Sequence, residues 1–316
     1  MIRKRILITG GYGFVGRHLL RAVADNSCTL AVLARKGPDS ECVRSLPRHE
    51  FLEADLACPE TATDQICRFR PDTIFHLASH PDGAESSTQT QTCIATNVLG
   101  TLQVLEAARQ TGATLVIGDS VKSYGNTDEP YSPSTSEAPN SSYAISKLAA
   151  WNTAKLYVGL YGVKVTCIRP TLIYGPGEGF NLVEYVLNCV AENRPEIALD
   201  GGTQTRDPLY ISDAVRAYIA AADNIDAVLG EAINIGGGAE YSIHDIAAAI
   251  VKIAGGNANI TDQPAKSRPT EIWRSACDNS DAFEKLGWAP EVSMEVGIGR
   301  VVQYRQALYS QQLKIA

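Results

Sequence analysis

Short apolar runs alternate with longer amphipathic stretches through the first half of the chain. The short runs are rich in aliphatic residues, as buried strands are, and they lie at 5–8, 30–33, 51–52, 73–77, 114–117 and 163–168. Apolar residues at helical spacing predict helices over 14–24, about 91–110 and 142–160. Strands that are apolar throughout and separated by helices predict a parallel sheet covered on both faces.

The pattern becomes less regular after residue 175. It predicts helices near 181–192, over 212–222 and from Ser242, which can cap its helix, and a strand at 233–235. We therefore expect a first domain over 1–175 and a smaller, interleaved lobe over 176–316, with segments of about 206–236 returning to the first domain. The predicted fold class is α/β: a doubly wound parallel sheet with a smaller C-terminal α/β lobe.

Composition narrows the classes of function. The 316 residues include 28 Lys and Arg against 35 Asp and Glu, a net charge of −7, which argues against a nucleic-acid partner. No apolar stretch approaches the roughly 18 residues of a membrane span, and the N-terminus does not resemble a signal peptide. The eight cysteines form no Cys-x-x-Cys pair, and the five histidines lack metal-ligand spacing. We expect reduced thiols, a cytoplasmic location and no metal site.

A glycine-rich turn follows the first predicted strand. Gly10, Gly13 and Gly16, with Phe14 and Val15 between them, join that strand to the first helix. Glycines at this junction permit a tight turn and bring backbone N–H groups close to a pyrophosphate at the positive end of the helix. The turn predicts a dinucleotide site.

The end of the second strand bears on the choice of dinucleotide. NAD sites usually carry an acidic residue there for the ribose 2′-hydroxyl, but this chain has Arg35 and Lys36. Two cations favour a 2′-phosphate and thus NADP, unless they are ordinary surface charges. Asp55, after the third strand, is either a contact of the adenine end or a helix cap.

A second motif carries acid–base chemistry. Tyr143 and Lys147 are four residues apart on a predicted helix and share one face, where the ammonium can lower the pKa of the phenol. Ser120 lies at the C-terminal end of the fifth strand, where open α/β sheets hold their ligands. These three side chains predict proton exchange at a substrate oxygen whose carbon gives or takes a hydride.

Together these elements make the chain resemble the extended short-chain dehydrogenase/reductases, in particular their NAD(P)-dependent nucleotide-sugar epimerase/dehydratase branch. The resemblance extends nearly from end to end. Its motifs are the glycine turn at 10–16, Asp55-Leu56, the run 76–79, Asn97 within 97–101, Ser120 four residues before Tyr124, Tyr143 with Lys147, Arg169-Pro170, the turn 174–177, the run 206–213, the strand 233–236, Arg268-Pro269 and the run 286–288.

The resemblance implies a Rossmann-type fold and a set of roles. Tyr143 would be the acid/base, Lys147 would hold the nicotinamide ribose, and Ser120 would bind the reacting oxygen. Arg206 and Arg268 would grip the diphosphate of a nucleotide sugar. The implied cofactor-binding residues are Gly10, Gly13, Phe14, Val15, Gly16, Arg35, Lys36, Asp55, Leu56, Leu77, Ala78, Ser79, Asn97, Tyr143 and Lys147. Relatives usually form homodimers through the helix that bears Tyr143 and its neighbour.

The chain departs from the family pattern at the substrate side. Leu172 replaces an Asn that usually contacts substrate. Val121 and Lys122 replace the acidic pair, or Asp-Lys, of the 4,6-dehydratases, so Lys122 is either an extra acid or base or a structural lysine. His80 and Asp82 fall where the sugar would lie, although polar loop residues need no role there.

These observations predict hydride transfer at one carbon of a nucleotide sugar, most simply carbon 4. A 4-ketoreductase is favoured by the NADP signature, and a 4-epimerase by its frequency in the branch. The alternatives are a 4,6-dehydratase, which Val121 disfavours, and a reductase of a non-sugar ketone. A cofactor-sensing regulator would have no need of Ser120, Tyr143 and Lys147 together.

Overall fold

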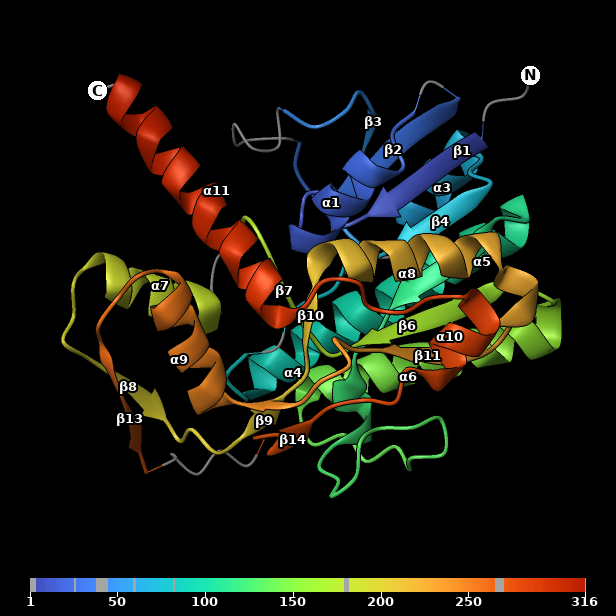
Figure 1. Cartoon of the computed structure of the whole chain (residues 1–316). Coiled ribbons are helices and arrows are strands. Elements are labelled where there is room, and N and C mark those ends of the chain that lie inside the picture. Colours follow the sequence, from blue (N-terminus) through green and yellow to red (C-terminus); the bar gives the residue numbers. More distant parts are fainter. Residues whose placement is uncertain are drawn as a thin grey trace.

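The computed structural model describes residues 4–25, 27–37, 45–58, 61–81, 83–178, 182–264 and 270–315. Its centre is a seven-stranded sheet in the order β11-β6-β5-β4-β1-β2-β3, with every neighbouring pair parallel (Figure 1). The strands are β1 (Lys4–Thr9), β2 (Cys28–Ala34), β3 (Glu50–Glu53), β4 (Thr73–His76), β5 (Thr114–Gly118), β6 (Val165–Pro170) and β11 (Ala232–Ile235). The predicted parallel sheet is confirmed.

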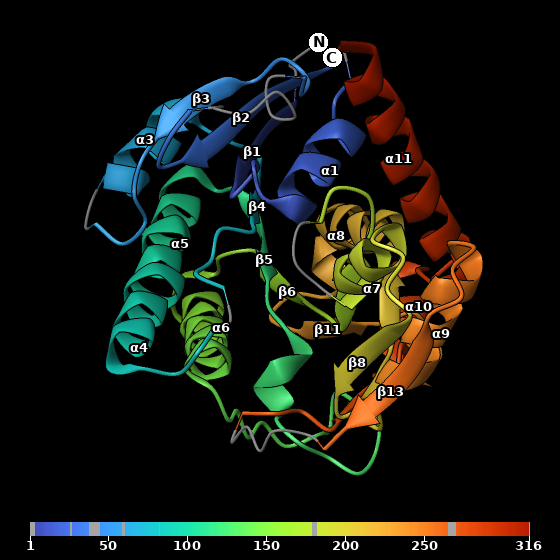
Figure 2. The same ribbon diagram turned by 90° about the vertical axis from the view of Figure 1, so that its left-hand side faces the viewer.

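Helices cover both faces of this sheet (Figure 2). One face carries α1 (Phe14–Ala22) and α8 (Ile211–Asp223); the other carries α3 (Thr61–Phe69), α5 (Gly100–Thr111) and α6 (Ser142–Tyr161). Alternate residues of a strand point to opposite faces, so Ile6 and Ile8 pack in the first core and Leu7 in the second. This burial of both faces explains why the strands are apolar throughout.

Short elements lie beyond the C-terminal edge of the sheet. Their paired strands are β7 (Leu172–Tyr174) with β10 (Pro208–Tyr210), β8 (Glu196–Asp200) with β13 (Asn259–Gln263), and β9 (Thr205–Arg206) with both β12 (Tyr241–Ser242) and β14 (Arg274–Ser275). Helices α7 (Leu182–Ala191) and α9 (Ile243–Ile253) pack together beside them. The last helices are α10 (Ser280–Leu286) and the long α11 (Met294–Ile315), which extends outward in Figure 1.

The predicted elements are present, with one informative difference. Ser242 caps α9, and its hydroxyl accepts the Asp245 N–H at 3.0 Å. The helix expected over 91–110 instead begins earlier, as α4 (Ser87–Cys93), and continues through the π-helical turn η1 (Ile94–Leu99) into α5. Strand β11 lies beside β6, and α8 packs on β5 and β6, although β11 and α8 both follow residue 176 in the sequence.

Within the described residues, no helix has both the length and the apolar character needed to cross a membrane.

Candidate active site

The glycine turn between β1 and α1 leaves no room for side chains. A Cβ on Gly10, whose φ is +69°, would lie 2.7 Å from the backbone N of Ala78, and one on Gly16 would lie 2.2 Å from the carbonyl oxygen of Gly10. Gly13 precedes α1 without a side-chain cap, so the first N–H groups of the helix are open to a ligand. These features fit a dinucleotide pyrophosphate at the helix N-terminus.

A pocket of about 250 Å³ opens beside this turn, at the C-terminal edge of the sheet. It brings together residues from separate parts of the chain: its lining includes the predicted Gly10, Arg35, Asp55, Leu56, Ala78, Ser79 and His80. The Asp55 carboxylate also accepts the N–H of Ala57 at 3.0 Å, so it stabilises the local turn of the backbone as well. The pocket adjoins the glycine turn, so one end of a dinucleotide bound at that turn would enter it.

Other predicted cofactor residues lie outside that pocket lining. Lys36 is exposed, while Phe14, Val15 and Leu77 pack against the core beneath the turn. Sequence reasoning missed Thr92 and Thr96, which do line the pocket. They are four residues apart, the spacing of one helix face, but no motif singled them out.

Asn97 connects the pocket to α6. Its amide oxygen accepts the N–H of His80 at 2.6 Å, and its amide nitrogen donates to the carbonyl of His80 and, at 2.9 Å, to the hydroxyl of Ser146. Asn97 lies in the π-helical turn η1, and its side chain is buried. Asn97 therefore positions the pocket wall at His80 against the helix that carries Tyr143 and Lys147.

Ser120, Tyr143 and Lys147 come together where β5 ends. Ser120 caps the short turn η2 (Val121–Tyr124), which packs against α6, and Tyr143 lies in the first turn of that helix. The Lys147 ammonium donates to the carbonyl oxygen of Gly118 at 2.7 Å and lies 5.7 Å from the centre of the Tyr143 ring. This arrangement can support proton exchange at a substrate hydroxyl.

Burial governs the electrostatics around Lys147. Desolvation lowers the pKa of its ammonium, and the negative charge of Asp119 opposes that shift. Burial, with a further contribution from Lys147, lowers the pKa of His76 to about 3. The His76 ring is therefore neutral at physiological pH, and its nitrogens hydrogen-bond to Thr9 and Thr101.

The predicted substrate residues that the structure describes lie in different elements. Arg206 donates to the carboxylate of Glu271 at 2.9 Å and to the carbonyl oxygens of Thr205 and Ile272. Lys122 is part of η2, next to Ser120. Asp82 and Arg268 lie outside the described residues.

Leu172 lies in β7, which pairs with β10. Its side chain lines a small apolar cavity with Leu182, Pro208, Ile246 and Met294, among others. The side chain that replaces the expected Asn therefore contributes to apolar packing between β7, α7 and α11.

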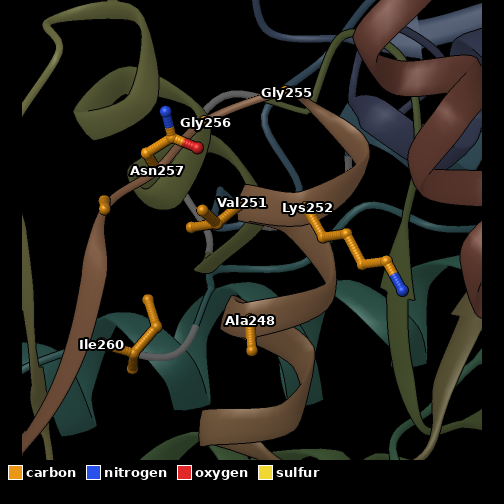
Figure 3. Close-up of a pocket in the computed structure, with 8 residues that line it drawn as sticks. Ala248, Val251, Lys252, Gly255, Gly256, Asn257 and Ile260 are labelled. Carbon is orange, nitrogen blue, oxygen red and sulfur yellow. The ribbon is translucent and has the colours of Figure 1, made fainter.

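A wider depression of about 490 Å³ lies on the outer side of the smaller lobe, along α9 and β13 (Figure 3). Of its lining residues only Lys252 is charged, and the rest are small or apolar apart from Asn257. None of the predicted site residues lines it, and we assign it no role in catalysis.

Comparison with known proteins identifies the family. The model of the NAD dependent epimerase/dehydratase family matches residues 6–236, which include the glycine turn, Ser120, Tyr143 and Lys147. The chain belongs to the NAD dependent epimerase/dehydratase family. The resemblance to the extended short-chain dehydrogenase/reductases is thereby confirmed, and so is the expectation of an enzyme that uses a nicotinamide cofactor.

Relatives of this epimerase/dehydratase match it along its whole length. The UDP-glucose 4-epimerase of Mycolicibacterium smegmatis is 30% identical, with 95% of this chain and 98% of the relative covered. The dTDP-glucose 4,6-dehydratase of Neisseria meningitidis serogroup B is 27% identical, with 95% and 93% covered. The crystal structure of UDP-glucuronic acid 4-epimerase from Bacillus cereus, in complex with UDP-glucuronic acid and NAD, has a TM-score of 0.86 and 27% identity over 96% of this chain and 100% of its own.

Proposed function

We propose that this family member is a nucleotide-sugar 4-epimerase. The observation that carries the proposal is the meeting of Ser120, Tyr143 and Lys147 at the C-terminal end of β5, on the same sheet edge as the glycine turn. The end-to-end similarity to UDP-sugar 4-epimerases supports the substrate class. Val121, in place of an acidic residue, disfavours the elimination of water that a 4,6-dehydratase performs.

The side chains of the site would divide the proton chemistry. Tyr143 accepts the proton of the 4-hydroxyl through its phenolic oxygen and later returns it, while Ser120 donates a hydrogen bond to the same substrate oxygen. Lys147 lies beside the Tyr143 ring, and its positive charge favours the ionised phenol. The nicotinamide, when bound, supplies the capacity to accept a hydride from carbon 4 and to return it.

The smaller lobe over 176–316 would bind the nucleotide sugar. We assign Arg206 and Arg268 to the diphosphate, because guanidinium groups bind phosphate oxygens bidentately. Arg206 is supported by its position: its partners Glu271 and Ile272 hold it in a fixed orientation, with its side chain 19% exposed. His80 and Lys122 would lie toward the sugar.

The purified protein tests this proposal directly. An epimerase should interconvert the 4-epimers of a UDP sugar, such as UDP-glucose and UDP-galactose, without net consumption of added cofactor. Products are separated by anion-exchange chromatography, and the panel extends to UDP-glucuronic acid and to dTDP, CDP and GDP sugars. Release of water to give a 4-keto-6-deoxy sugar would reject epimerisation in favour of dehydration.

One observation favours a second candidate, a 4-ketoreductase that uses NADP. Arg35 lines the cofactor pocket at the end of β2, where it could pair with a 2′-phosphate. Stoichiometric oxidation of NADPH with a 4-keto nucleotide sugar would establish this activity. We propose NADP as the preferred cofactor on the same ground.

The preference for NADP can be tested with two neighbouring cations. Arg35→Ala should weaken binding of NADP at least tenfold while changing binding of NAD much less, because only NADP carries the phosphate. Lys36→Ala removes the same charge at a residue that does not line the pocket, and it is the matched control. Equal losses for NAD and NADP in Arg35→Ala, measured by fluorescence titration, would contradict the preference.

We also propose that the protein forms a homodimer through α5 and α6. Large apolar side chains are exposed along these adjacent helices, among them Leu102, Ile145, Leu156, Leu160 and Tyr161. Several large apolar side chains exposed on two adjacent helices are typical of an association surface. A cytoplasmic location is part of the proposal, because the free cysteines suit a reducing compartment.

A further inference from the structure

A buried ion pair lies behind the proposed catalytic residues. Arg169, on β6, donates through Nε to Oδ2 of Asp119 at 2.7 Å, and both side chains are at most 2% exposed. Nη2 of Arg169 donates to the Glu137 carboxylate at 2.6 Å, where Glu137 is 28% exposed. Burying charges is costly, so such a pair does not by itself account for stability, and its neighbours indicate what else it does.

The Asp119 carboxylate is on the side of the sheet that α6 covers. Asp119 follows Gly118, the last residue of β5, whose carbonyl oxygen accepts the Lys147 ammonium. Leu115 and Ile117 alternate with it along the strand and belong to the core beneath α6. The carboxylate thus shares its side of the sheet with Lys147.

Asp119 also holds the turn that contains Ser120. Its Oδ1 accepts the Ser123 hydroxyl at 3.3 Å, and the guanidinium of its partner Arg169 lies 4.8 Å from the centre of the Tyr124 ring. Ser123 and Tyr124 belong to η2, the turn that Ser120 caps. The C-terminal half of this turn therefore contacts the ion pair, and Asp119 directly precedes Ser120 at its N-terminal end.

The formal charges of this cluster balance. Asp119 and Glu137 carry two negative charges, and Arg169 and Lys147 carry two positive ones. His76 is neutral at physiological pH, and burial raises the pKa of the Cys167 thiol well above its ordinary value, so neither compensates Lys147. The titratable groups that face Lys147 or its neighbour Tyr143 from the surrounding elements are His76, Cys93, Asp119, Tyr143, Cys167 and Tyr218.

We propose that Asp119 is a positioning residue for Ser120 and Lys147. It fixes the turn that Ser120 caps, through Ser123 and Arg169. It also supplies the negative charge that keeps Lys147 an ammonium ion inside the protein. This inference rests on the proposed roles of Ser120, Tyr143 and Lys147. Its test is the titration of Lys147 itself, which requires no substrate, so a failed substrate assay and a failed positioning role remain distinguishable.

The experiment uses the full-length protein labelled with ¹³Cε-lysine. Lys147→Met identifies the Lys147 signal by its absence, and the signal is followed by NMR as pH rises. In Asp119→Asn we expect the pH of half-titration to fall by about one unit or more, because a negative charge that favours the ammonium ion is lost. The alkaline limb of any measured pH–rate profile should shift in the same direction.

Two further variants complete the test. Glu137→Gln removes a negative charge from the same Arg169 at a more exposed position, and it should shift the Lys147 titration less than Asp119→Asn does. Asp119→Asn with Arg169→Gln replaces the ion pair by a neutral hydrogen-bonded pair and covers the case in which the single variant does not fold. It should lower the Lys147 titration by less than Asp119→Asn alone, because the positive charge of Arg169 is lost together with the negative charge of Asp119. An unchanged Lys147 titration in the folded variants would overturn the proposal.

Discussion

Single side chains in this protein act through neighbours that are distant in sequence. Tyr143 and Lys147 could be paired from their spacing alone, because a helix places residues four apart on one face. The partners of Arg206 could not be predicted in this way, since Glu271 follows it by 65 residues and meets it only through the packing of β9 against β14. The motif identified the guanidinium, whereas its orientation is a property of the fold.

Replacing Tyr143 by Phe tests the acid/base role at this scale. Tyr143→Phe should reduce kcat by about 10²- to 10⁴-fold, because the phenolic proton is lost while the ring remains. Cofactor affinity should stay within about threefold of the parent, since the ring still packs beside Lys147. Steady-state rates and cofactor titration measure the two quantities.

The matched control is Tyr157→Phe, which removes a hydroxyl from the same helix away from the site. It should leave kcat essentially unchanged. If Tyr143→Phe retained the parent rate, Tyr143 would not be the acid/base.

Whole elements were predictable where one periodicity runs through them. The strands β1, β2, β4, β5 and β6 are mostly apolar at their centres because both faces are covered, and the sequence predicted each of them. The run from α4 to α5 was harder, because the π-helical turn η1 changes the phase of the helix. Leu99 and Leu102 are 49% and 39% exposed while Leu105 is buried, although the three share helical spacing.

The short strands of the smaller lobe were mostly not predictable. β8 and β13 pair in parallel across more than fifty residues, and β9, β12 and β14 are two residues long. A strand of two residues is too short to show a periodicity, and the pairing of distant segments is decided by tertiary packing. The pocket residues Thr92 and Thr96 were missed for a related reason, because they contact the site only once the helix is placed.

Glycines in two helices allow a test at the scale of an element. In α1, a Cβ on Gly16 would meet backbone atoms of Gly10 and Gly11, which cannot move without distorting the turn. We expect Gly16→Ala to lower the free energy of unfolding by about 1–3 kcal/mol and cofactor affinity at least tenfold. Chemical denaturation and cofactor titration measure these effects.

Gly299→Ala is the comparison in α11, where a Cβ would have nothing within 4 Å. This change should raise the free energy of unfolding by about 0.5–1 kcal/mol, because alanine loses less conformational freedom on folding. Similar losses of cofactor affinity in both variants would show that the turn at Gly16 is not part of the cofactor site.

At the scale of the whole molecule, several large apolar side chains on α5 and α6 are exposed on the part of the surface that the structure describes. Leu156 and Leu160 are 55% and 63% exposed on α6. Leu156→Glu with Leu160→Glu should convert the proposed dimer to monomer, because burying two carboxylates in an apolar contact is costly. Sedimentation velocity gives the oligomeric state.

Phe283→Glu provides the control for that change. Phe283 is 65% exposed but lies on α10, which packs on α8 and β11 rather than on the α5–α6 face. It should leave the oligomeric state unchanged. A parent protein that sediments as a monomer would contradict the proposed dimer.

The position of β11 beside β6 has a consequence for biosynthesis. During synthesis, β6 emerges from the ribosome before α7, α8 and β11 have been made. In the growing chain β6 is therefore an unpaired edge strand of the sheet. Exposed edges of this kind invite pairing with other unfinished chains. Products of premature termination after residue 175 should therefore aggregate rather than persist as a free N-terminal domain. The sheet becomes complete only when the polypeptide has emerged beyond Ile235, and this delays the protection of its most apolar layer until late in synthesis.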